Sequence, residues 1–60
     1  MPFVHLEMLE GRTFEQKKAL VEELTAVISK HTGAPTEAIH IILRDIPRGD
    51  GLAQGGKFRD

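Results

Sequence analysis

The 60-residue chain has no cysteine, tryptophan or tyrosine, and none of its apolar runs is long enough to cross a membrane. The lack of cysteine excludes disulfides and thiolate-bound zinc. The charges nearly cancel, with Lys and Arg totalling 8 against 9 for Asp and Glu, so the basic character of a nucleic-acid-binding domain is also missing. The first residues do not resemble a signal peptide. We therefore predict a cytoplasmic protein that binds neither nucleic acid nor a membrane.

The short length limits how the chain can be stabilised. Residues 1–60 form one domain, and a domain of this size buries only about 60% of the surface that its unfolded chain exposes. Small domains usually gain further stability from disulfides, a metal or oligomerisation. Disulfides are excluded, and the three histidines, His5, His31 and His40, show no metal-ligand spacing. We expect no metal and no cofactor, and we predict that the chain forms a homo-oligomer.

The first half of the chain has the pattern of a strand followed by a helix. Apolar and polar residues alternate over 4–8, which is typical of a half-buried strand. Thr13 and Gln16 form a capping-box pattern, and Gly33 followed by Pro35 is a helix stop, so we predict a helix over residues 14–32. The apolar stripe of this helix would consist of Leu20, Leu24, Val27, Ile28 and His31.

A second strand is predicted over residues 39–46, where β-branched residues are frequent and Pro47 ends the run. A strand, a helix and a strand form a βαβ unit, whose strands lie parallel with a right-handed crossover. The glycine-rich remainder is expected to be a loop or a small hairpin. This α+β unit leaves both sheet edges unpaired, so we expect the sheet to be completed by other copies of the chain.

Pro2 has two possible roles. Proline cannot donate to a sheet ladder, so it is suited to the start of an edge strand. Alternatively, removal of Met1 would leave Pro2 with a free secondary amine. An α-amino group titrates at about pH 7.7–8.0 in peptides, and burial or a nearby cation lowers that pKa. An apolar pocket and one arginine would therefore make such an amine a general base at neutral pH.

Several segments resemble one known family. The opening MPFVHLEMLEGR, the helical EQKKAL, the Ala34–Pro35 pair and the Gly55–Gly56 pair together resemble the 4-oxalocrotonate tautomerase family. The resemblance implies a βαβ protomer that assembles into a hexamer, with the processed Pro2 as general base. It also implies that Arg12 binds a substrate carboxylate.

Three further residues are candidate substrate-binding positions: Leu9, His40 and Leu52. Phe3, Leu9 and Leu52 are available as the apolar lining of the pocket, with Leu52 in place of an aromatic residue that the family pattern has in this tail. His40 stands where the best-known members carry a second arginine, and it would donate a hydrogen bond to the substrate carbonyl. Because histidine is mostly neutral at pH 7, this departure favours a monocarboxylic substrate over a dicarboxylic one.

The site is expected to lie between subunits. From Pro2 to Leu9 an extended strand rises roughly 25 Å, so Arg12 of the same chain cannot reach the Pro2 nitrogen. Antiparallel pairing of the first strand with its copy would bring Leu9 and Arg12 of a second subunit beside Pro2. The predicted activity is keto–enol or dienol–enone tautomerisation of small 2-oxo or 2-hydroxy acids.

Other functions remain open from the sequence. Decarboxylation of a small oxo acid is one alternative. Hydrolytic dehalogenation is a second, although in the resembled superfamily it usually relies on an extra arginine where this chain has Leu9. A third alternative, from another class, is a non-catalytic oligomeric binding module, in which the Pro2 nitrogen would have no chemical role.

Overall fold

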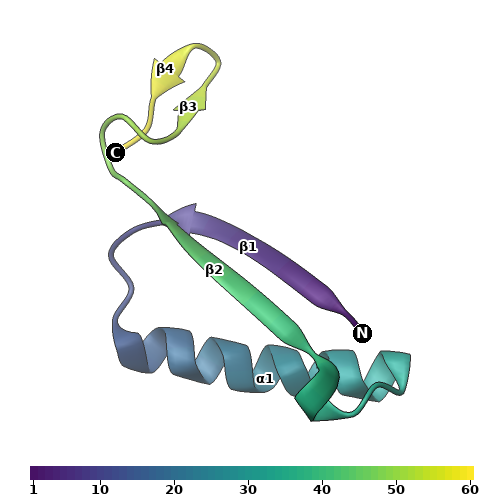
Figure 1. The fold of residues 1–60 in the computed structure, drawn as a ribbon. Coiled ribbons are helices and arrows are strands. Elements are labelled where there is room, and N and C mark those ends of the chain that lie inside the picture. The colour runs from purple at the N-terminus through teal and green to yellow at the C-terminus, as the bar shows by residue number, and fades with distance from the viewer.

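A computed structural model describes all residues, 1–60, and has a βαβ unit followed by a hairpin (Figure 1). The elements are strand β1 (Phe3–Leu9), helix α1 (Phe14–Thr32), the 3₁₀ helix η1 (Thr36–Ala38), strand β2 (His40–Ile46), and the short strands β3 (Ala53–Gln54) and β4 (Lys57–Phe58). The predicted fold class is confirmed, and the tail forms the hairpin alternative. The helix has the predicted bounds, whereas η1 was not predicted. Helix α1 is not apolar enough to cross a membrane.

Strands β1 and β2 form a two-stranded parallel sheet, as predicted. Their register runs from the pair Phe3 and His40 to the pair Leu9 and Ile46. Alternate residues along each strand point to opposite faces, so every register pair shares one face. One face lies against α1, where Lys17 forms an ion pair with Asp45 of β2. The other face, opposite the helix, carries no element of the chain, and we call it the open face (Figure 1).

The ends of α1 are fixed by local hydrogen bonds. The Thr13 hydroxyl accepts a hydrogen bond from the Gln16 backbone N–H at 3.1 Å, and the Gln16 side chain accepts one from the Thr13 backbone N–H at 2.9 Å. This arrangement is the predicted capping box. At the other end Gly33 has a φ of 78°, the left-handed conformation that glycine adopts without steric cost.

The face that α1 turns towards the protein differs from the predicted stripe. Val27 and His31 are exposed, whereas Thr25 and Ser29, which lie outside the predicted stripe, are half-buried. The half-buried residues recur at helical spacing and form the stripe that lies against the sheet: Lys17, Leu20, Val21, Leu24, Thr25, Ile28 and Ser29. Near the end of this stripe the Ser29 hydroxyl donates to the Ala34 carbonyl at 2.7 Å.

The protomer is open and has no core of its own. None of its residues is fully buried, and Phe3 and Phe58 are more than half exposed. Its radius of gyration is 14.2 Å, against about 10 Å for a compact domain of this length. Its accessible surface of 4653 Å² exceeds the value of about 3,900 Å² typical of a folded monomer of this mass by about 700 Å².

The C-terminal hairpin extends past the carboxyl end of β2, away from α1 (Figure 1). Gly55 and Gly56 form its two-residue turn, with φ values of 62° and 83° that suit a type I′ turn. All residues from 47 to 60 are exposed, so the hairpin packs against nothing else in the protomer.

Candidate active site

Pro2 and His40 lie together at the amino end of the sheet. The His40 backbone N–H donates to the Pro2 carbonyl at 3.0 Å, which extends the ladder of the two parallel strands by one bond. Pro2 is half-buried and precedes the first residue of β1. The parallel register of β1 and β2 therefore brings the predicted base and the predicted carbonyl-binding residue to one place.

The His40 imidazole is held by two contacts. Its ring stacks on the Phe3 ring, with centroids 4.6 Å apart and planes inclined by 13°. Its Nδ1 lies 3.2 Å from the Ala38 carbonyl oxygen. The Phe3 contact was not predicted from the sequence, although in-register parallel strands that begin at Phe3 and His40 would have placed these two side chains side by side.

Arg12, Leu9 and Leu52 lie at the carboxyl end of the sheet. An Arg12 Nη1–H donates to the Leu9 carbonyl at 2.9 Å, and the exposed guanidinium retains further N–H donors for a ligand. Leu9 is half-buried, and Leu52 lies in the tail that follows β2. The seven residues of β1 span about 23 Å, so a single protomer separates Arg12 from Pro2 by that order of distance.

A second arginine fixes the turn between β1 and α1. The Arg48 backbone N–H donates to the Glu10 carboxylate at 2.9 Å, and Arg48 Nε–H donates to the Glu10 carbonyl at 3.1 Å. Gly11 has a φ of 127°, and a Cβ there would lie 3.2 Å from Arg48 Nη2. This link across the end of the sheet was not predicted, and it positions the backbone that leads into Arg12.

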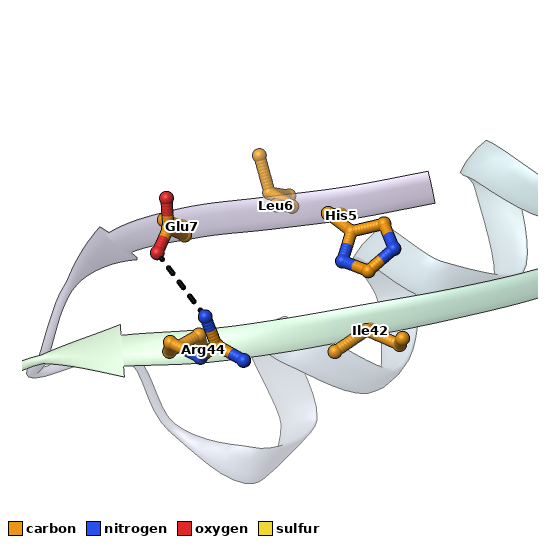
Figure 2. A pocket seen from close by; sticks show the side chains of 5 residues that line it. All are labelled: His5, Leu6, Glu7, Ile42 and Arg44. Carbon is orange, nitrogen blue, oxygen red and sulfur yellow. Dashed lines mark ion pairs between the residues drawn. The ribbon is translucent and has the colours of Figure 1, made fainter. Parts of the chain in front are cut away.

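The open face carries a shallow groove of about 110 Å³ (Figure 2). Its lining residues are His5, Leu6, Glu7, Ile42 and Arg44. Glu7 and Arg44 form an ion pair across the strands at 3.5 Å, so the Arg44 charge is already partly balanced. Neither this groove nor the second groove of the protomer, beside α1, includes Pro2, Arg12 or His40. No three His, Asp or Glu side chains cluster closely enough to hold a metal ion.

The arrangement is a small βαβ protomer with an open sheet face and its candidate residues divided between the two ends of the sheet. Residues 2–60 match the family described as "Tautomerase enzyme". A probable tautomerase of Lactococcus lactis is 56% identical over 59 residues, covering 98% of this chain and 95% of its own length. The chain therefore belongs to the tautomerase family, as the resemblance predicted.

Solved structures agree with this assignment. A homologue of 4-oxalocrotonate tautomerase is 38% identical, with a TM-score of 0.90 over 97% of this chain and 90% of its own. A heterohexameric 4-oxalocrotonate tautomerase from Chloroflexus aurantiacus is 29% identical, with a TM-score of 0.87 over 97% of this chain and 92% of its own. The whole chain, including the hairpin, is thus typical of this fold.

Proposed function

We propose that the protein is a cofactor-independent tautomerase of small 2-oxo and 2-hydroxy acids, with the Pro2 amine as general base once Met1 is removed. One observation carries the proposal: Pro2 and His40 lie at one end of the sheet, and Arg12, Leu9 and Leu52 lie at the other. Family membership supports the reaction class.

The complete site forms between copies of the chain. Antiparallel pairing of β1 with its copy places Arg12 and Leu9 of the second copy beside Pro2. The accessible surface of the protomer exceeds that of a compact monomer of the same mass by about 700 Å². This excess is close to the roughly 800 Å² of surface that each partner buries in a standard interface. We propose a homohexamer, an assembly size that the heterohexameric relative also has.

In the assembled site each group has a distinct task. The Pro2 nitrogen lone pair takes a proton from the carbon next to the substrate carbonyl. The C–H electron pair becomes the enolate double bond, and the ammonium then returns the proton at another position. Arg12 holds the substrate carboxylate with charge-assisted hydrogen bonds. Hydrogen-bond donors in a site closed to water stabilise the enolate, so the reaction requires no metal.

The substrate is proposed to carry one carboxylate. Arg12 is the permanent cation of the proposed site, Arg44 is paired with Glu7, and the Arg48 guanidinium is held by the Glu10 backbone carbonyl. A monocarboxylic oxo acid, such as the enol of an arylpyruvate, therefore matches the charge better than a dicarboxylic dienol.

A substrate screen of the processed protein tests this function. The panel contains enols of 2-oxo acids, 2-hydroxydienoic acids, an oxo acid that can lose CO₂, and a haloacrylate, each measured with the parent and with Pro2→Ala. We expect tautomerisation that falls about 10²- to 10⁴-fold in Pro2→Ala, the usual contribution of a general base. Halide or CO₂ release without tautomerisation would assign one of the other activities. A panel with no Pro2-dependent turnover would favour a binding module.

A further inference from the structure

The contacts of the His40 ring define which of its nitrogen atoms carries hydrogen. Nδ1 lies 3.2 Å from the Ala38 carbonyl oxygen. A carbonyl oxygen accepts hydrogen bonds and donates none, so Nδ1 must be the donor in this contact. In the neutral imidazole one ring nitrogen is a donor and the other is an acceptor. Neutral His40 therefore presents a lone pair at Nε2.

The Phe3 ring fixes the plane in which this lone pair lies. Its separation of 4.6 Å and its inclination of 13° from the imidazole are typical of an aromatic stack. Exposed side chains usually change rotamer, but a ring that is stacked on one face and bonded at one nitrogen has a single preferred orientation. Phe3 and the Ala38 carbonyl together therefore hold the imidazole in one orientation, at the end of the sheet where the His40 backbone bonds to Pro2.

We propose that neutral His40 accepts the enol hydroxyl proton of the substrate at Nε2, and that Phe3 is the residue that positions it for this transfer. This inference rests on the proposed function and adds a second proton-transfer group to it. The site would then take substrates in the enol form, with a hydroxyl next to the carbon–carbon double bond. The sequence-based expectation was that His40 donates a hydrogen bond to the substrate carbonyl. In this proposal the neutral ring instead accepts a proton from the substrate.

The proton balance of ketonisation is complete with these two groups. The enol O–H proton moves to His40 Nε2, and the O–H electron pair becomes the second bond of the carbonyl. The electron pair of the carbon–carbon double bond takes a proton from the Pro2 ammonium. His40 is left as an imidazolium and Pro2 as a neutral amine, and exchange with water restores both. In the reverse reaction the imidazolium donates to the carbonyl while Pro2 removes the carbon proton.

Few charged or titratable groups lie near this imidazole. Phe3 covers one face and Ala38 accepts from Nδ1, and neither is charged. Within the protomer the titratable groups on the flanking segments are His5, two residues along β1 from Phe3, Glu37 in η1, and the N-terminus, which becomes the Pro2 amine once Met1 is removed. The pH dependence of the rate would therefore report mainly the protonation of His40 and of Pro2.

The pH dependence of ketonisation separates this mechanism from one that uses Pro2 alone. With both groups, kcat/KM needs neutral His40 and protonated Pro2, so it falls at low pH and again at high pH. With Pro2 alone as the proton acceptor, kcat/KM rises with pH to a plateau. We expect the two-sided profile in the parent protein. In His40→Gln the acid-side fall should disappear, and the rate should drop about 10²- to 10⁴-fold. His31→Gln, on the exposed end of α1, is the matched control and should keep the parent profile.

The role of Phe3 is tested by ¹⁵N NMR of the histidine-labelled assembly, which distinguishes the two neutral imidazole tautomers. We expect His40 to carry its hydrogen on Nδ1 in the parent, and to show both tautomers together with slower ketonisation in Phe3→Leu. Phe3→Tyr keeps the stack and should restore both properties.

Two results would overturn this inference while leaving Pro2 as the base. One is hydrogen on Nε2 of His40 in the parent, and the other is a kcat/KM that rises with pH to a plateau and that His40→Gln leaves unchanged. Turnover that survives Pro2→Ala would instead overturn the proposed function.

Discussion

Truncation of Ile42 to alanine tests whether a second copy covers the open face. Ile42 lies in the middle of this face, lines its groove beside His5, and is 40% exposed in the protomer (Figure 2). In an assembly that buries the face, Ile42 becomes a core residue. The loss of a core isoleucine side chain costs about 2–5 kcal/mol, because both the transfer free energy and the packing around the cavity are lost.

That cost should appear in association rather than in the fold of one chain. An energy of 2–5 kcal/mol weakens an equilibrium constant by about 30- to 5,000-fold. Sedimentation velocity and thermal unfolding, each over a series of protein concentrations, measure the effect. We expect the parent Tm to rise with protein concentration, since association stabilises only the folded chain. Ile42→Ala should dissociate at concentrations at which the parent remains assembled.

Val27→Ala is the matched control, since Val27 is 54% exposed on the outward flank of α1 and its truncation should change stability by less than about 0.5 kcal/mol. A parent protein that sediments as a monomer with a concentration-independent Tm would refute the argument. Equal, small effects of Ile42→Ala and Val27→Ala in an assembled protein would show that the contact surface lies elsewhere.

Four further predictions concern single substitutions and one mixture of two variants. Arg12→Ala should raise KM for carboxylic acids about 10- to 150-fold, the equivalent of a charge-assisted contact of about 1.5–3 kcal/mol, without changing assembly. Unchanged kinetics would mean that Arg12 is an ordinary surface residue that does not bind the substrate. Mixing Pro2→Ala chains with Arg12→Ala chains should restore part of the activity, because some sites then combine intact residues from two chains. His40→Arg should shift kcat/KM towards dicarboxylic dienols, and an unaltered preference would place His40 outside the site. Thr13→Ala should lower the stability measured by denaturant unfolding by about 1 kcal/mol, because the helix loses its N-cap, and no loss would contradict the capping role.

The helix could be predicted with its ends because its signals are local. Thr13 and Gln16 are three residues apart, and Gly33 supplies the left-handed conformation next to the last helical residue. The parallel sheet followed from the order strand, helix, strand. The glycine-rich tail was expected to be either a loop or a small hairpin, and the structure has the hairpin.

The features that were missed include local ones as well as a contact between distant parts of the chain. Three residues after Pro35 form η1, so the second strand begins at His40, one residue later than predicted. The buried face of α1 includes Val21, Thr25 and Ser29 and leaves out Val27 and His31, because the former residues share the side of the helix that lies against the sheet. The stack of Phe3 on His40 requires the strand register, which alternation along a single strand does not specify.

The most direct test of the Pro2 mechanism compares the state of the N-terminus with activity. An amide nitrogen has no basic lone pair, so a chain that retains Met1 cannot use Pro2 as a base. Intact mass spectrometry of preparations with different degrees of Met1 removal gives the fraction of chains that begin at Pro2, and tautomerase activity is measured on the same samples. We expect activity proportional to that fraction. Full activity in a preparation that retains Met1 would contradict it.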